Sequence, residues 1–519
     1  MARPNRRTRS HPFTPRDTAL LQHARRLFVA HRYDEALDQF ELAVRSEPDN
    51  PLALIDAGRA YGLRHDRARA TALVERLLRL APDDMELNFR AGETYRLMDL
   101  HREALSCFEK ACRQARPAPQ AWLELAGLYE RTHQLEKARD ALDRLLKAEP
   151  GHPGGLLIRA RLERRERQSD AAIMTLEKLL AVPQPNDRIV AEAWGALALV
   201  HDERGDYDAA WRAILRCKQT QAPHAEAAWA AARHVTDRFR SLYDELSAEH
   251  MRRWAELPPH ETPRRVALLT GFPRSGTTLL EQVLKGQSAL VSTEERDIFS
   301  ANVFPWLGRE RAADVPVLRL LEELPPERVA AARKRYLAAV ESYQREPLGD
   351  RWHLDKNPAM NPLIPALYRV FPEMRFVVAL RDPRDVVLSC FLRYLPITPL
   401  SVHFLTLEQT VEKYLFDLRA WLRLREWLPT GWLETRYEDV VTNLEGEARR
   451  VFEFLQLEWN PAALNFPERA VSQAATSPSY VDVTAPLHTR AVSRWRHYER
   501  HLGPSLERLG PMLSALAYE

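Results

Sequence analysis

A glycine-containing segment in the second half of the chain has the composition of a phosphate-binding loop. The sequence GFPRSGTT, residues 271–278, follows an apolar run at 266–270 and precedes a helical pattern that begins at Leu279. Gly271 and Gly276 let backbone amides turn inward, and the start of the following helix adds partial positive charge, so an anion is favoured there. The glycine spacing is that of a nucleotide-triphosphatase loop, but Thr277 stands where those loops carry a phosphate-binding lysine.

A second segment offers a guanidinium and a hydroxyl to an anion. The apolar run RFVVAL at 375–380 is followed by RDPRDVVLS at 381–389, which continues into a predicted helix. Arg381 stands at the carboxyl end of the predicted strand and Ser389 two turns into the helix, so both can hold one phosphate group from two directions. The alternative for Arg381 is a salt bridge with a neighbouring aspartate at the strand end.

These segments resemble sulfotransferases that use 3′-phosphoadenosine 5′-phosphosulfate (PAPS). PRSGTT at 273–278 resembles the loop that holds the 5′-phosphosulfate, and RDPRDVVLS resembles the segment that holds the 3′-phosphate. LETRYEDVV at 433–441, SPSYVDVTAP at 477–486 and SRWRHY at 493–498 resemble further family segments, so the resemblance covers about residues 265–505. The donor-binding residues that it implies are Arg274, Ser275, Gly276, Thr277, Thr278, Arg381, Ser389, Tyr437, Ser479 and Arg494.

The same resemblance implies a catalytic lysine and a catalytic base. The chain has nine lysines against 66 arginines, and Lys356 lies in WHLDKNP at 352–358, which resembles the family's lysine-containing strand end. Lys356 and Arg274 would stabilise the negative charge that grows as the S–O bond breaks. Glu295 occupies the position of the catalytic glutamate in the tyrosyl-protein branch. The adjacent Glu294 stays an alternative, as does His353, because another branch uses a histidine base.

The elements that must position these residues are those of an α/β fold. Apolar strands at 266–270 and 375–380, each followed by a loop and a helix, predict an α/β domain with a parallel sheet over 265–519. The resemblance implies that this is a P-loop-like sulfotransferase domain. The segment 225–264 is helical in pattern and ends in prolines at 258, 259 and 263, so we expect a connecting or capping helix and a linker. No His or Cys cluster has metal-ligand spacing, so no metal is expected.

A 34-residue periodicity runs through the first half of the chain. Aligning 17–50, 51–84, 85–118 and 119–152 without gaps, and continuing to a block from 153, brings Ala or Gly into register at two positions. These small residues are Ala24, Gly58, Gly92, Ala126 and Ala160 at position 8, and Ala36, Ala70, Ala104, Ala138 and Ala172 at position 20. The period resembles the tetratricopeptide repeat, which implies an all-α solenoid of about six repeats over 17–224 with a concave surface for a peptide or protein.

Composition limits the remaining possibilities. A chain of 519 residues exceeds one ordinary domain, and 45% hydrophobic with 28% charged residues is typical of globular proteins. A net charge of +3 gives no overall electrostatic case for nucleic acid or an anionic membrane, and no apolar run approaches the ~20 residues of a membrane span. Four cysteines without paired spacing favour a cytoplasmic location. Residues 1–16 are expected to be a flexible basic tail without a secretory signal.

These observations favour transfer of a sulfuryl group from PAPS to a hydroxyl acceptor. A protein tyrosine or a glycan is the candidate acceptor, and we expect the solenoid to bind part of a peptide or protein acceptor. The alternative is a non-catalytic tetratricopeptide adaptor with a relic nucleotide-binding domain. A kinase or triphosphatase is disfavoured, because the loop lysine and a magnesium-binding carboxylate strand are both lacking. Residues 482–485 differ from the family pattern, so acceptor contacts are not transferred there, and the sequence does not specify an oligomeric state.

Overall fold

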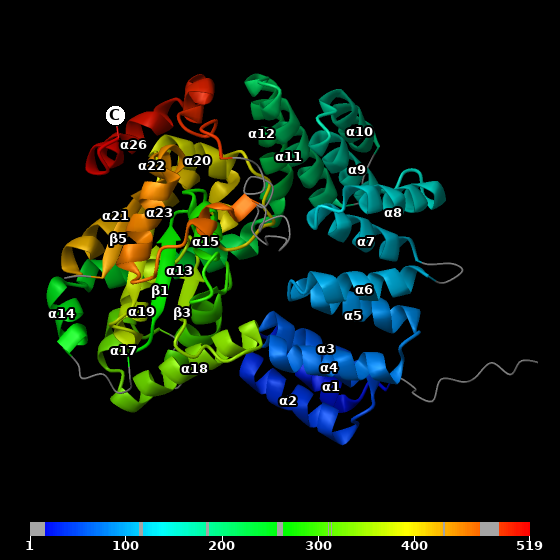
Figure 1. The fold of residues 1–519 in the computed structure, drawn as a ribbon, viewed down its shortest axis with the longest axis horizontal. Helices are drawn as coiled ribbons and strands as arrows, with labels where there is room; N and C mark the ends of the chain where they lie inside the picture. The colour runs from blue at the N-terminus through cyan, green and yellow to red at the C-terminus, as the bar shows by residue number, and fades with distance from the viewer. Residues whose placement is uncertain are drawn as a thin grey trace, which may run out of the picture. The chain divides into compact units, whose positions relative to one another are not determined.

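The chain divides into two compact units. The structure is a computed structural model, and it describes residues 16–113, 118–182, 186–256, 263–309, 311–312, 314–428, 431–467 and 487–518. The first unit comprises Met1–Leu128 with Glu341–Glu346, and the second comprises Tyr129–Val340 with Pro347–Glu519. Figure 1 shows paired helices along the first part of the chain, and a sheet flanked by helices in the later part. The tail at 1–15, the linker at 257–262 and Ser479 lie outside the described residues.

The first unit consists of consecutive helix pairs, as the 34-residue period predicts. Its helices are α1 (Ala19–Val29), α2 (Tyr33–Ser46), α3 (Pro51–Leu63), α4 (Arg67–Leu80), α5 (Met85–Leu97), α6 (His101–Cys112) and the first part of α7 (Pro119–Arg131). Close helix packing explains the small residues at position 8, because a Cβ at Gly92 would lie 2.7 Å from the ring of Phe108.

The turn inside each helix pair repeats with the same period. A residue with positive φ lies just after the first helix of each of these pairs: His31, His65 and Asp99 in the first unit, and His133 and Arg167 in the second. These positions are 34 residues apart, so the backbone geometry follows the sequence repeat. The predicted all-α solenoid of tetratricopeptide type is therefore confirmed.

The second unit begins with the later repeat helices, followed by the long helix α13 and the shorter helix α14. These elements are α8 (Leu135–Ala148), α9 (Pro153–Arg165), α10 (Ser169–Ala181), α11 (Asp187–Glu203), α12 (Tyr207–Gln221), η1 (Ala222–His224), α13 (Glu226–Glu245) and α14 (Ala248–Glu256). One cluster of buried residues contains Leu197 and Ile214 from α11 and α12 together with Phe391, Trp495 and Tyr498. The last repeats therefore share a hydrophobic core with the α/β part of this unit.

The α/β part contains a five-stranded parallel sheet. Strands β1 (Val266–Gly271), β2 (Leu290–Ser292), β3 (Trp352–Lys356), β4 (Arg375–Leu380) and β5 (Trp432–Arg436) lie in the order β2-β3-β1-β4-β5. All neighbouring pairs are parallel, and Leu269 of β1 is paired with Lys356 on one side and Val377 on the other. Every residue of β1 is buried, as expected for a central strand between layers of helices. The predicted parallel sheet is confirmed.

Helices connect the strands and cover the sheet. They are α15 (Thr277–Leu284), η2 (Phe299–Val303), α16 (Phe304–Leu307), α17 (Val317–Glu322), α18 (Pro326–Gln344), η3 (Asn361–Leu363), α19 (Ile364–Val370), α20 (Pro383–Phe391), η4 (Ser401–Leu405), α21 (Leu407–Trp427), α22 (Tyr437–Thr442), α23 (Leu444–Phe454), η5 (Pro461–Leu464), η7 (Arg494–Tyr498), α25 (Glu499–Leu502) and α26 (Pro504–Ala515). From β1 the chain runs to β2 at one edge of the sheet, and from β4 it runs to β5 at the other edge. The carboxyl ends of β1 and β4 therefore form a topological switch point, where open α/β sheets bind ligands.

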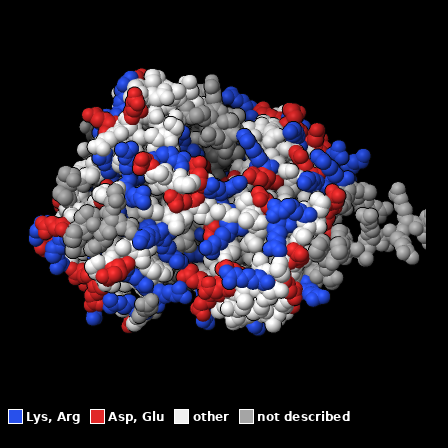
Figure 2. Space-filling model, turned by 60° about the horizontal axis from the view of Figure 1, so that its bottom comes forward, with Lys and Arg blue, Asp and Glu red and all other residues white. Residues whose placement is uncertain are grey.

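Charge is distributed without a dominant sign on the face that Figure 2 displays. Basic and acidic side chains are interspersed there, in keeping with the net charge of +3. Among the helices that the structure describes, none has the length and apolar character needed to cross a membrane. The local arrangement of charges at the switch point is therefore more informative than the overall charge.

Candidate active site

The loop after β1 has a backbone conformation that requires its glycines. Gly271 has a φ of +149° and Gly276 a φ of +96°, values that glycine adopts most readily. A Cβ at Gly271 would collide with the carbonyl oxygen of Ala379, and one at Gly276 would lie 2.7 Å from the Tyr437 ring. Helix α15 begins at the next residue. The loop therefore leads directly into a helix N-terminus, as phosphate-binding loops do.

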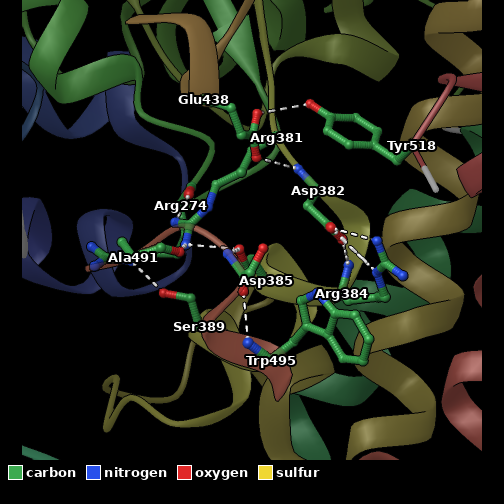
Figure 3. Close-up of polar contacts among 11 residues, drawn as sticks. Arg274, Arg381, Asp382, Arg384, Asp385, Ser389, Glu438, Ala491, Trp495 and Tyr518 are labelled. Atoms are coloured by element: carbon green, nitrogen blue, oxygen red, sulfur yellow. Dashed lines mark hydrogen bonds and ion pairs between the residues drawn. The ribbon is translucent and has the colours of Figure 1, made fainter. Parts of the chain in front are cut away.

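Four of the predicted donor-binding residues come together at the switch point. Arg274 Nε donates a hydrogen bond of 3.1 Å to Ser389 Oγ on α20. Arg381 Nη1 donates one of 3.1 Å to the carbonyl oxygen of Arg274 (Figure 3). The Arg381 guanidinium lies 4.6 Å from the centre of the Tyr437 ring. Two guanidinium groups, a hydroxyl and an aromatic ring therefore meet at one place, although they come from separate segments.

Arg381 is buried, but among the described residues not all N–H groups of its guanidinium have a hydrogen-bond partner. Its side chain is 7% exposed, and its Nε has no hydrogen-bond partner among the described residues. Its Nη2 donates to the carbonyl oxygen of Ala491 and lies 3.7 Å from the Asp385 carboxylate. Asp385 accepts two backbone hydrogen bonds of 2.8 Å, from Ser493 and Trp495 (Figure 3). A buried guanidinium with an unused N–H is suited to receive an incoming anion.

The other predicted donor-binding residues occupy different surroundings. Ser275, Thr277 and Thr278 are buried in the loop and in the first turn of α15. Arg494 begins η7, and its guanidinium forms an ion pair with Asp202 of α11. Within the described ranges, no group of three or more His, Cys, Asp or Glu side chains is arranged to hold a metal ion.

A second polar cluster surrounds Lys356 at the carboxyl end of β3. Lys356 is fully buried, and its Nζ forms ion pairs with Glu295 and, at 3.6 Å, with Glu281 of α15. Ser292 Oγ donates a hydrogen bond of 2.5 Å to Glu281. Burial raises the pKa of Glu281, and Lys356 opposes that rise. In such a cluster a carboxylate can act as a general base, and the ammonium can stabilise developing negative charge.

The three candidate bases of the sequence are in different environments. Glu295 pairs with Lys356, whereas Glu294 accepts a hydrogen bond of 2.9 Å from Lys285 Nζ. His353 is fully buried, and its Nε2 lies 3.1 Å from Thr293 Oγ1. Burial lowers the pKa of His353 to about 3. Of the three candidates, Glu295 is therefore the one that pairs with Lys356.

Sequence reasoning did not single out two buried acidic residues of the site, Glu281 and Asp385. Glu281 is the one charged residue of α15, every residue of which is buried, and a carboxylate in a buried helix needs a polar partner. Asp385 follows Arg381 by four residues, a spacing that favours an ion pair on a helix. These signals are weak, because each residue type at such a spacing is also common on solvent-exposed helix faces.

Known proteins with sequence similarity include enzymes from animals. Protein-tyrosine sulfotransferase 1 of Danio rerio is 26% identical over 268 residues, which cover 48% of this chain and 71% of the relative. An uncharacterized protein of Aquifex aeolicus (strain VF5) is 23% identical over 396 residues, 74% of this chain, and the chain spans about half (49%) of that relative. The sulfotransferase domain of the Synechococcus PCC 7002 olefin synthase is a solved structure with 21% identity and a TM-score of 0.34, covering 46% of this chain and 90% of that domain.

The family matches cover both parts of the chain. The pattern of the sulfotransferase family matches residues 267–461, which run from the second residue of β1 through β5 and contain Arg274, Lys356 and Arg381 of the site. Patterns of the tetratricopeptide repeat match residues 21–84 and 119–161. The chain therefore combines tetratricopeptide repeats with a domain that matches the sulfotransferase family.

Proposed function

We propose that this protein is a PAPS-dependent sulfotransferase that acts on a hydroxyl of a peptide or protein. The observation that carries the proposal is the buried cluster in which Lys356 pairs with Glu281 and Glu295. This cluster stands at the end of β3, beside the strand β1 whose loop carries Arg274. The match to the sulfotransferase family supports sulfuryl transfer as the general activity.

The residues at the switch point fit an anionic donor. Among the described residues, one buried N–H of Arg381 has no hydrogen-bond partner; the Arg381 guanidinium contacts Arg274, which in turn contacts Ser389. Arg381 and Ser389 would hold the 3′-phosphate of PAPS, while Arg274 and the loop amides would hold the 5′-phosphosulfate. When bound, the donor supplies an activated sulfuryl group together with its own leaving group.

Glu295 and Lys356 would have different catalytic roles. The Glu295 side chain is 33% exposed and can meet an acceptor hydroxyl arriving from solvent, whereas Lys356 is fully enclosed. Glu295 would take the hydroxyl proton, and the Lys356 ammonium would stabilise negative charge as the S–O bond breaks. Glu281 lies on the inner side of Lys356 and would hold the ammonium in position.

A protein tyrosine is the acceptor that we favour. The animal relatives are named protein-tyrosine sulfotransferases, and a tetratricopeptide solenoid offers an extended surface for a peptide. The four cysteines are buried and form no disulfides with one another. This is consistent with a reducing cytoplasm, which we propose as the location.

Calorimetric titration with 3′,5′-adenosine diphosphate, the desulfated product of PAPS, tests the donor site. ATP with magnesium, titrated in parallel, serves as the comparison. We expect the bisphosphate to bind and ATP to bind weakly or not at all. Binding of ATP with magnesium alone would contradict the proposal, and binding of neither nucleotide would favour the non-catalytic adaptor.

The acceptor is tested separately with labelled PAPS. A tyrosine-containing peptide is compared with the same peptide in which phenylalanine replaces the tyrosine, because only the hydroxyl differs. Label in the tyrosine peptide alone would support a tyrosine acceptor. Label in neither peptide, from a chain that binds the bisphosphate, would move the acceptor to another hydroxyl class such as a glycan.

A further inference from the structure

The C-terminal segment 491–502 is held by two parts of the second unit. On one side, the backbone N–H groups of Ser493 and Trp495 donate to Asp385 of α20. On the other side, side chains of the last repeat, α11 and α12, contact the same segment. The ring of Tyr207 on α12 stacks on His497, with ring centres 4.5 Å apart. The segment therefore contacts both α20 and the last repeat.

Asp202, near the end of α11, makes the main polar contact from the repeat. Its carboxylate pairs with the Arg494 guanidinium and accepts a hydrogen bond of 2.6 Å from the Tyr498 hydroxyl. The Asp202 side chain is 12% exposed, and Tyr498 is fully buried. These contacts are largely shielded from solvent, so removing one partner would leave the other poorly solvated.

Further contacts tie α11 and α12 to the α/β part. Lys218 Nζ donates a hydrogen bond of 2.8 Å to the carbonyl oxygen of Arg393, just beyond α20. Gly195 of α11 leaves room for Tyr394, because a Cβ at this position would collide with that side chain. The last repeat therefore contacts both the C-terminal segment and the chain that leaves α20, the helix that carries Asp385 and Ser389.

We propose that Asp202 is a positioning residue of the donor site, and this inference rests on the proposed function. Asp202 holds Arg494, the backbone on either side of Arg494 binds Asp385, and Asp385 pairs with Arg381. A residue of the solenoid thus sets the position of the guanidinium that receives the 3′-phosphate. The last repeat is then part of the donor site, in addition to any role in binding a partner.

The direction of the effect follows from burial. Asp202→Asn would remove the ion-pair partner of the Arg494 guanidinium, so the segment would detach from Asp385 for part of the time. Arg381 would then be less well ordered. A loss of about one charge-assisted contact corresponds to a rise of about tenfold in the dissociation constant for the bisphosphate.

The test compares three variants of the full chain. Asp202→Asn removes the charge, Asp202→Glu keeps it, and Glu130→Gln is the matched control. Glu130 forms a similarly buried pair with Arg165, 3.1 Å apart, between two earlier repeats. Calorimetry gives the dissociation constant for 3′,5′-adenosine diphosphate, and amide hydrogen exchange reports on the N–H groups of Ser493 and Trp495.

We expect Asp202→Asn to raise the dissociation constant about tenfold and to accelerate exchange in the C-terminal segment. Asp202→Glu should recover most of the affinity, and Glu130→Gln should leave both readouts at wild-type values. Unchanged affinity and exchange in Asp202→Asn would overturn the inference, and so would an equal loss of affinity in Glu130→Gln. If the wild-type chain binds no bisphosphate while exchange still accelerates, the proposed function fails and the positioning contact stands.

Discussion

Replacing Lys356 with Met would remove a positive charge that lies 3.6 Å from the buried carboxylate of Glu281. Both side chains are almost fully enclosed, with 0% and 2% exposed, so solvent screens the pair very little. At 3.6 Å and an effective dielectric constant of about 20, Coulomb's law gives about 4–5 kcal/mol. Removing one member of a buried pair typically costs about 3–5 kcal/mol, and we expect a loss in this range.

The loss should depend on Glu281 and on pH. Burial raises the pKa of Glu281, and it should rise further when Lys356 is absent. A carboxyl group with a raised pKa in the folded state stabilises the fold at low pH, and this contribution is lost as pH rises through that pKa. The Lys356→Met variant should therefore recover stability relative to wild type as the pH is lowered.

Hydrogen exchange measured by mass spectrometry, on peptides from β3 and α15, gives the local free energy of opening. A double-mutant cycle of Lys356→Met with Glu281→Gln isolates their interaction. Lys285→Met is the control, because the Lys285–Glu294 pair is more exposed and should contribute no more than about 1 kcal/mol. An interaction energy below about 1 kcal/mol for Lys356 with Glu281 would refute the reasoning.

Four further predictions concern the donor site, the base and a buried carboxyl group. Glu295→Gln should lower sulfuryl transfer at least about a hundredfold, whereas Glu294→Gln should stay near wild type; equal losses in a labelled-PAPS assay would contradict the assignment of the base. Arg381→Ala should weaken binding of 3′,5′-adenosine diphosphate by about ten- to a hundredfold in calorimetry, and unchanged affinity would remove this residue from the donor site. Gly276→Ala should also weaken that binding, because φ is +96° and the added Cβ would press on an aromatic ring; wild-type affinity would show that the loop tolerates a side chain. Burial raises the pKa of Asp355 to about 7, so wild-type stability should fall relative to Asp355→Asn as pH rises from about 4 through 7; a pH-independent difference in thermal unfolding would contradict this.

Much of the fold was predictable because its signals are local. The small residues at positions 8 and 20 recur every 34 residues, and close helix packing requires them wherever they occur, as at Gly92 against Phe108. The loop GFPRSGTT is equally local, since Gly271 and Gly276 allow a conformation that other residues rarely adopt. Such patterns indicate a solenoid and a candidate anion-binding loop without reference to distant parts of the chain.

The repeat architecture, the parallel-sheet domain and the segments that supply the candidate site could thus be predicted from local patterns. The partners within that site depend on how these segments pack together. Glu295 and Glu294 are adjacent in sequence, but they pair with different lysines because the backbone turns at Glu294, where φ is +55°. Asp202 and Tyr498 are 296 positions apart. A contact at such a separation depends on how whole helices pack, so no local pattern in a single sequence could have indicated it.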